Sequence, residues 1–211
     1  MKSLQDKIYE CTLHECPLYE GFYENTSRMI RPSSKEELKK EIRIRLDRGQ
    51  TNLNDIDTSK IINMNSLFSD FSKYDLSNLD ISKWDVSNVK YMNTMFYNCS
   101  NFNSDLSKWD VSNVEYMGNM FFGCKNFNSD LSSWDTSKVE NMSNMFCHCH
   151  KFNSDLSSWD TSKVEDMSNM FCNCYNFNSD LSKWNTSSVR NVRCMFKGAG
   201  IKKLPKWYEN S

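Results

Sequence analysis

The residues best suited to bind a metal are two cysteines and two histidines in one run, Cys147-His148-Cys149-His150, with Cys172 following 25 residues after Cys147. Thiolates and imidazoles are the ligands that zinc prefers. The spacing argues against a finger-type site, because four consecutive residues project in different directions, whereas finger sites take pairs of ligands from separate loops. We expect no metal and no other cofactor. Metal binding or redox sensing by this Cys/His cluster is the alternative function.

Four cysteines recur every 25 residues and form what we call the core cysteine column: Cys99, Cys124, Cys149 and Cys174. Ala199 takes the next place, which indicates that the position needs a small apolar filler, so we expect buried thiols. The chain has nine cysteines, and this odd count excludes a complete internal disulfide framework. A local disulfide between Cys11 and Cys16 would require an oxidising compartment.

Carboxylates form two more columns with the same spacing. The first contains Asp80, Asp105, Asp130, Asp155 and Asp180; the second contains Asp85, Asp110, Asp135 and Asp160 and ends in Asn185. Like charges one repeat apart repel, so donors or cations must compensate each of them. Asp near Ser is typical of chain reversals, and Asn185 could accept the same bond without a charge. We expect a repeated turn hydrogen bond, with calcium binding as the alternative.

No catalytic constellation stands out. The three histidines, His14, His148 and His150, belong to no nucleophile motif, and the chain has no phosphate-binding glycine loop. Carboxylates occur in pairs only because the repeat copies them. We therefore expect the chain not to be an enzyme.

All these residues are placed by a tandem repeat of 25 residues. A tryptophan marks each copy: Trp84, Trp109, Trp134, Trp159 and Trp184. A looser first copy begins near Asp57, before a three-residue insertion, and a half-copy around Trp207 closes the array. We divide the chain into an N-terminal extension with a capping helix (1–52), the repeats (53–199) and a C-terminal cap (200–211).

Each copy shows two periodicities. Val114, Met117, Met120, Phe121 and Cys124 lie on one face of a short predicted helix. Pairs of serine and glutamate three residues apart predict capping boxes at its start: Ser112 with Glu115, Ser137 with Glu140, and Ser162 with Glu165. The preceding segment, 106–114, has the alternation of a strand with one buried face. Such units hide their apolar faces only by stacking, so we expect an α/β fold: a right-handed leucine-rich-repeat-like solenoid with parallel strands on one side and helices on the other.

The ends of such an array need covers. Ser34 and Glu37 predict a capping box, residues 38, 42 and 46 are apolar and spaced four apart, and Gly49 is a natural stop. We expect an amphipathic capping helix here rather than a membrane-binding one, because glutamates offset its lysines. At the other end, Pro205 and the lysines around it should blunt the exposed edge.

The motif F-N-x-D-L-S-x-W-D-V-S-x-V-x-x-M-x-x-M-F, over about residues 53–199, resembles the BspA-like repeat family, also described as the Mycoplasma-type lipoprotein repeat. The resemblance implies a bacterial surface or secreted protein with a role in adhesion, host contact or antigenicity. The N-terminal residues as given lack the continuous apolar core of a secretory signal, so we expect neither a signal peptide nor a lipid-attachment cysteine here, and no stretch approaches a membrane span. The sequence thus leaves the compartment open.

The formal net charge of -1, from 26 basic and 27 acidic residues, argues against nucleic acid as the partner. We expect another protein, with a host protein among the candidates, to bind the outward positions, and the oligomeric state stays open. The candidate partner-binding residues are Lys108, Asp110, Ser133, Asp135, Ser158, Asp160, Lys183, Asn185, Tyr91 and Tyr116.

Overall fold

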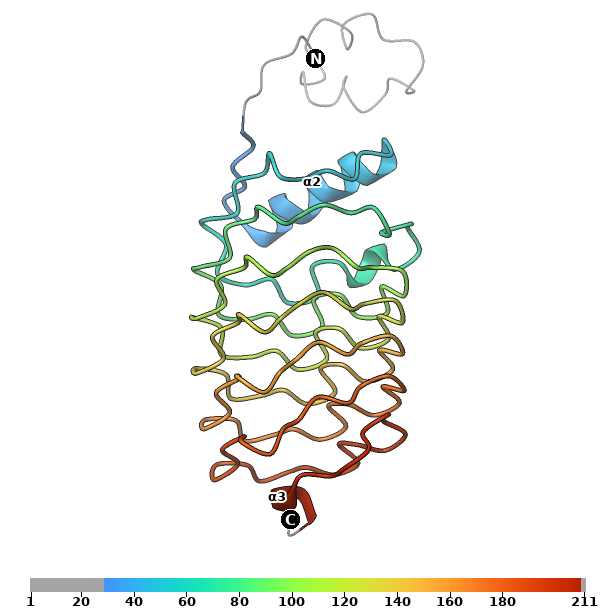
Figure 1. Ribbon diagram of the computed structural model, residues 1–211. Helices are drawn as coiled ribbons and strands as arrows, with labels where there is room; N and C mark the ends of the chain where they lie inside the picture. Colours follow the sequence, from blue (N-terminus) through green and yellow to red (C-terminus); the bar gives the residue numbers. More distant parts are fainter. Residues whose placement is uncertain (1–28, 210–211) are drawn as a thin grey trace, which may run out of the picture.

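The structure is a computed structural model that describes residues 29–209 (Figure 1). Its helical elements are α2 (Lys35–Asp47), the 3-10 helix η2 (Ser69–Phe71) and α3 (Lys206–Glu209). Between η2 and α3 the chain winds in coils stacked on one another, with α2 across one end of the stack and α3 at the other. Each coil corresponds to one copy of the repeat.

The coils are in register. Isolated parallel bridges join residues 25 positions apart, as in Tyr91–Tyr116 and Tyr116–Asn141, and this series continues to Asn191. The first bridge of the series joins Asn63 to Tyr91, 28 positions apart. The stacking of the copies and the three-residue insertion in the first of them are therefore confirmed.

The predicted α/β architecture is wrong. Across residues 29–209 the repeats contain no α-helix and no strand; η2 is a single 3-10 turn in the first copy, and β-pairing is limited to isolated bridges. In the segment predicted to be helical, the N–H groups alternate between two kinds of acceptor. Met117 and Asn119 donate to carbonyls of the next coil, Asn141 and Ser143, at 3.0 and 2.8 Å, whereas Met120 donates to a carbonyl three residues back at 3.1 Å. The coil is thus a series of tight turns cross-linked to its neighbours.

Left-handed residues enforce these turns. Asn119 has φ 57° and Gly123 has φ 74°, and the same two columns are left-handed in every copy after the first, as at Asn144 and His148. A residue at positive φ interrupts a helix, and glycine and asparagine adopt this conformation at the lowest cost. An isolated helix of about ten residues is also marginal. Bonding between identical neighbouring coils satisfies the backbone instead.

The predicted capping boxes and strands are also wrong, because their backbone N–H groups bond within turns or to the preceding coil. The N–H of Ser112 donates to Asp110 Oδ1 at 3.0 Å, and that of Glu115 donates to the Lys90 carbonyl of the preceding coil at 2.9 Å. In the predicted strand, the Trp109 N–H bonds the Leu106 carbonyl at 3.1 Å, which closes a turn. The serine–glutamate pairs and the alternating segment therefore mark turns within a coil and bonds to its neighbour.

The interior of the stack is a set of aromatic ladders. The rings of Phe96 and Phe121 are parallel within 3°, with centroids 5.5 Å apart, and the ladder continues through Phe146 and Phe171 to Phe196. The five repeat tryptophans are at most 4% exposed, and each indole N–H donates to a carbonyl of the preceding coil, as Trp134 does to Leu106 at 3.0 Å. Such stacks contribute ~1 kcal/mol per ring pair beyond area burial.

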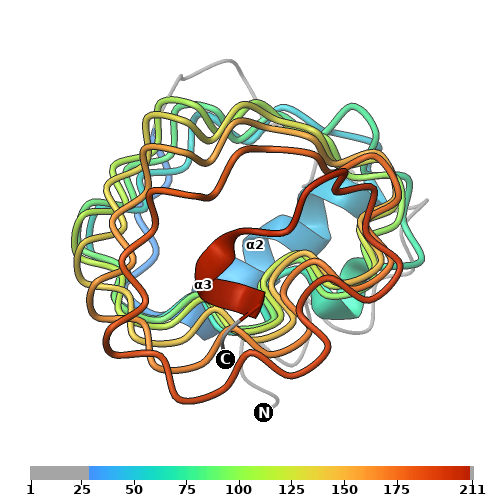
Figure 2. The ribbon, with the colours of Figure 1, turned by 60° about the horizontal axis from the view of Figure 1, so that its bottom comes forward.

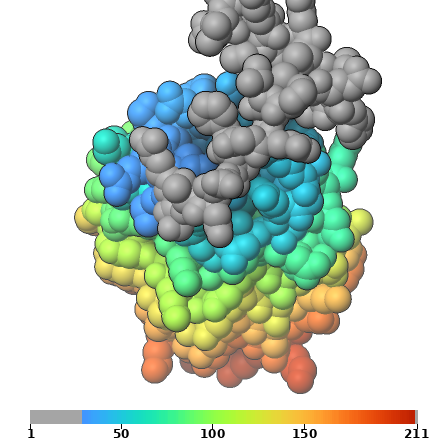
Figure 3. Space-filling model, turned by 90° about the horizontal axis from the view of Figure 1, so that it is seen from above, coloured from blue at the N-terminus to red at the C-terminus, as the bar shows by residue number. Residues whose placement is uncertain are grey.

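Helix α2 covers the N-terminal end of the stack, where blue residues lie across the first coils in Figure 3. Ser34 is its N-cap and accepts the Glu37 N–H at 3.1 Å, and its buried residues are Leu38, Ile42 and Leu46. The predicted helix is confirmed. The carboxylate of Glu37, however, accepts from Ser33 rather than from Ser34.

At the C-terminal end, Trp207 stacks on Trp184 with centroids 6.4 Å apart, and its indole N–H donates to the Leu181 carbonyl at 2.8 Å. Trp207 thus repeats the bonding of the preceding tryptophans, as expected for a closing half-copy. Among residues 29–209, no helix has the length and apolar character that a bilayer crossing requires.

Candidate partner-binding surface

Eight of the ten predicted partner-binding residues are exposed and lie in two adjacent columns: Lys108, Asp110, Ser133, Asp135, Ser158, Asp160, Lys183 and Asn185. They flank the buried tryptophans, so Trp109, for example, lies between Lys108 and Asp110. In-register stacking places one such pair on each successive coil. The surface is therefore a regular polar strip along the stack.

Part of the strip's hydrogen-bonding capacity is used within the protein. The hydroxyl of Ser133 donates to the Ser107 carbonyl at 2.7 Å, and that of Ser158 donates to the Ser132 carbonyl at 2.8 Å. These serines link coils, a role that sequence reasoning missed. The charged groups of Lys108 and Lys183 are the more available contacts.

The carboxylates of the strip hold turns, as expected. Asp110, Asp135 and Asp160 each accept the N–H of the serine two residues later at 2.9–3.0 Å, and Asn185 makes the same bond at 3.1 Å. Bonds from the side chain and the backbone of Ser137 lower the pKa of Asp135, and the backbone and side chain of Ser162 do the same for Asp160. Only Oδ1 of each Asp takes part in its turn bond, so the other oxygen can face a partner.

The other Asp column has the same geometry. Asp155 and Asp180 accept the N–H groups of Ser157 and Ser182 at 2.9 Å. Lys183 lies beside both carboxylates on the wall of a shallow polar depression. In the part of the chain that the structure describes, neither the Asp columns nor the Cys/His cluster brings three metal-binding side chains together.

The remaining two predicted residues, Tyr91 and Tyr116, are half-buried and stack with centroids 5.7 Å apart and planes 12° apart. The Tyr116 hydroxyl donates to Glu140 Oε2 at 2.9 Å, and this bond raises the pKa of the phenol. Beside them, Lys90 pairs with Glu115 at 3.0 Å. The tyrosines thus lie next to the ion pair of Lys90 and Glu115. Sequence reasoning did not identify this pair, although its two residues are also 25 positions apart.

The core cysteine column is buried, as predicted. The thiol of Cys124 donates to the Phe96 carbonyl of the preceding coil at 3.0 Å, and that of Cys149 does the same to Phe121 at 2.9 Å. Burial raises the pKa of Cys99 to about 12. These thiols are structural. Cys11 and Cys16 lie outside the described residues.

The Cys/His cluster is dispersed over its coil. Cys147 is buried, and burial, together with the neighbouring Cys172 thiol on the next coil, raises its pKa to about 12. His150 instead stacks on Tyr175 with centroids 4.8 Å apart. The structure therefore brings together two thiols of the cluster but not four ligands.

A family model with the description "Mycoplasma protein of unknown function, DUF285" matches residues 40–137 and 117–207. The chain belongs to this family. Together the two matches run from within α2 to the start of α3, so they include every coil. The Mycoplasma-type repeat noted in the sequence is thereby shown. No curated protein and no solved structure matches the chain.

Proposed function

We propose that the chain is a non-enzymatic protein-interaction module, with the polar strip and the neighbouring tyrosines as its contact surface. The observation that carries this proposal is that every repeat tryptophan is buried, while an exposed Lys or Ser precedes it and an exposed Asp or Asn follows it in register on successive coils. A repetitive surface suits a partner that contacts several coils at once. Tyrosine is enriched at protein interfaces, and charged groups at an interface contribute to specificity and to the association rate.

The partner is proposed to be another protein, and the sequence motif supports a finer role in bacterial surface display, adhesion, antigenicity or host contact. This finer role depends on kinship with BspA-like repeats, which we propose from the motif alone. The strand-and-helix architecture is not part of the proposal.

The test is a binding measurement with the purified chain and a partner identified by crosslinking. We expect the double variant Lys108→Glu/Lys183→Glu, and separately Tyr91→Ala/Tyr116→Ala, to weaken binding about tenfold or more. Lys73→Glu/Lys151→Glu is the matched control, because it makes the same charge change at exposed lysines outside the strip. Equal binding by all three variants would refute the named surface.

The thiol contact between Cys147 and Cys172 favours a second candidate, a redox-sensing pair. Hydrogen peroxide would oxidise the two thiols to one disulfide and be reduced to two waters. The raised pKa of Cys147 leaves little reactive thiolate at neutral pH, which makes this candidate the weaker one. Peptide mass spectrometry after peroxide treatment distinguishes the two, because a Cys147–Cys172 disulfide that alters partner binding would favour redox sensing.

A further inference from the structure

The last coil ends the stack with a row of unused backbone donors. In each preceding full coil, four alternate N–H groups donate to the next coil; in one coil these belong to Met167, Asn169, Phe171 and Asn173. The equivalent residues of the last coil are Val192, Cys194, Phe196 and Gly198, and their N–H groups have no acceptor among the described residues. We call these four N–H groups the donor edge.

Within the described part of the chain, the last coil has no free carbonyl groups beside the donor edge. Carbonyls of 191, 193, 195 and 197 accept from the preceding coil, and those of 192, 194 and 196 accept from turns within the last coil. Every carbonyl from 191 to 197 is thus in use. A ligand that pairs with this edge must therefore present acceptors, spaced as they are on a peptide backbone.

Helix α3 leaves the edge uncovered. It packs over the interior of the coil, where Tyr208 meets Phe196 edge-to-face at 4.9 Å and Trp207 continues the tryptophan ladder. Figure 2, in which this end comes forward, shows α3 inside the ring that the last coil forms. The perimeter that carries residues 192–198 lies around it.

The charge of the last coil differs from that of the coil before. Residues 190–203 include five basic and no acidic residues: Arg190, Arg193, Lys197, Lys202 and Lys203. The equivalent residues 165–178 include two acidic residues, Glu165 and Asp166, and no basic ones. Only Arg190 of the five has an ion-pair partner here, Glu165 at 3.3 Å. The rim of the donor edge therefore attracts negative charge.

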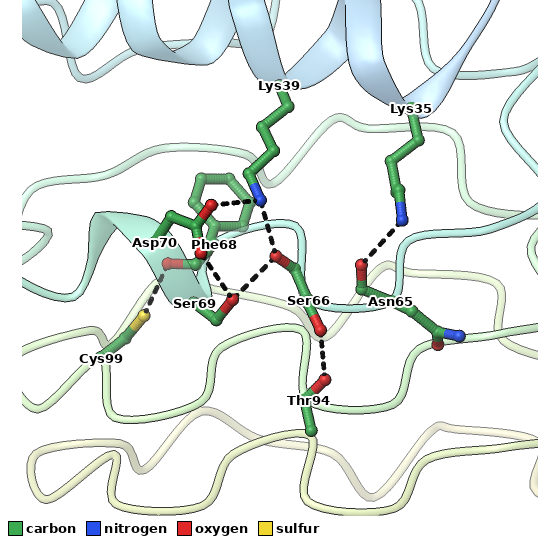
Figure 4. A network of polar contacts seen from close by, with 9 residues as sticks. All are labelled: Lys35, Lys39, Asn65, Ser66, Phe68, Ser69, Asp70, Thr94 and Cys99. Carbon is green, nitrogen blue, oxygen red and sulfur yellow. Dashed lines mark hydrogen bonds and ion pairs between the residues drawn. The ribbon is translucent and has the colours of Figure 1, made fainter.

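The opposite end shows how such an edge is closed. Its exposed carbonyls are covered by lysines of α2, with Lys35 Nζ 3.5 Å from the Asn65 carbonyl and Lys39 Nζ 3.5 Å from that of Ser66 (Figure 4). Lys39 also pairs with Asp70 at 2.7 Å. A second copy could not continue the stack head-to-tail without displacing α2, and two donor edges cannot pair with each other.

We propose that the donor edge binds an acidic segment of a partner protein, which follows the turns of the last coil as a further parallel layer. Its carbonyls would accept from the N–H groups of Val192, Cys194, Phe196 and Gly198, and its carboxylates would lie against the basic rim. This is backbone augmentation, in which main-chain bonds supply affinity and side chains supply specificity. The site is separate from the polar strip, so it does not depend on the function proposed above.

The test uses a fluorescein-labelled twelve-residue peptide of alternating glutamate and threonine, with binding followed by anisotropy. We expect saturable binding, weakened at least ~10-fold by Arg193→Glu/Lys197→Glu and ~3- to 10-fold by Val192→Pro, which removes one donor. Lys73→Glu/Lys151→Glu, an equal charge change at exposed lysines outside the last coil and the polar strip, should alter binding less than about twofold. A lysine–threonine peptide should not bind.

Inorganic polyphosphate of equal charge separates backbone pairing from charge attraction. If the peptide does not bind, or if Val192→Pro retains its fold and binds with wild-type affinity, the proposal is overturned. Amide hydrogen exchange of the wild-type chain tests the proposal without a variant, so its result does not depend on whether a variant folds. Added peptide should slow exchange at Val192, Cys194 and Gly198, whereas polyphosphate should not; equal protection by both would also overturn the proposal.

Discussion

Replacing Gly123 by alanine tests how closely the coils approach each other. Gly123 has φ 74°, and an added Cβ would lie 2.3 Å from Asn98 Oδ1 on the preceding coil. The left-handed backbone should cost ~1–2 kcal/mol with any L-residue. Displacing the Asn98 side chain should add ~1 kcal/mol or more. We expect Gly123→Ala to lower the free energy of unfolding by ~2–3 kcal/mol in total.

Two comparisons separate these costs in urea titrations followed by tryptophan fluorescence. Gly49 has nearly the same conformation, φ 70°, but nothing within 4 Å of an added Cβ, so Gly49→Ala should cost only the ~1–2 kcal/mol of the backbone. In an Asn98→Gly background, Gly123→Ala should fall to the same value, because the obstructing amide is gone. If Gly123→Ala costs no more than Gly49→Ala, or if Asn98→Gly does not relieve it, the coils are not stacked as described.

Three further outcomes follow from the buried thiols, the turn carboxylates and a strained backbone. Iodoacetamide applied to the native chain at pH 8 should leave the core cysteine column unlabelled while modifying half-buried Cys172, as peptide mass spectrometry would show; labelling of the column without denaturant would contradict its burial. The lowered folded-state pKa of Asp135 and Asp160 gives stability that is present above the unfolded pKa of about 3.9 and is lost as pH falls through the folded pKa. The variant Asp135→Asn/Asp160→Asn, which keeps the turn as Asn185 does, should therefore lose less free energy of unfolding between pH 5 and 2 than the parent. An equal loss in both proteins would show that these two carboxylates do not contribute to the acid sensitivity. Cys194 has φ 56° in a column where Asn119, Asn144 and Asn169 have nearly the same φ, and asparagine adopts this conformation at a lower cost than cysteine, so Cys194→Asn should raise the free energy of unfolding by ~0.5–1 kcal/mol. A lower melting temperature of this variant would contradict the assignment of strain.

The repeat made much of the fold predictable. The 25-residue spacing of Trp84 to Trp184 correctly indicated stacked copies with a shared aromatic interior, and Ser34, Leu38, Ile42 and Gly49 correctly placed α2. These signals are local or periodic, so they can be read without knowing which backbone groups pair. Asp and Asn185 were likewise assigned to turns because the chemistry of an Asx turn involves neighbouring residues only.

The predicted helices and strands were wrong because apolar spacing alone does not fix backbone conformation. Met117, Met120 and Phe121 face the interior in a chain of turns just as they would on a helix. The informative signal was the pair Asn119 and Gly123, which lie four residues apart at positions that require positive φ. The donor edge could not be found in the sequence, since it depends on which N–H groups lack a neighbouring coil.

Site-resolved amide hydrogen exchange of the free chain tests the central claim, that bonds between coils replace regular secondary structure and end at an open row of donors. Met142, Asn144, Phe146 and His148 donate to the next coil at 2.8–3.0 Å, so their amides should exchange slowly. The equivalent amides of Val192, Cys194, Phe196 and Gly198 should exchange faster by orders of magnitude. Equal protection of the two sets, or rapid exchange in both, would contradict the stacking from which every inference above is drawn.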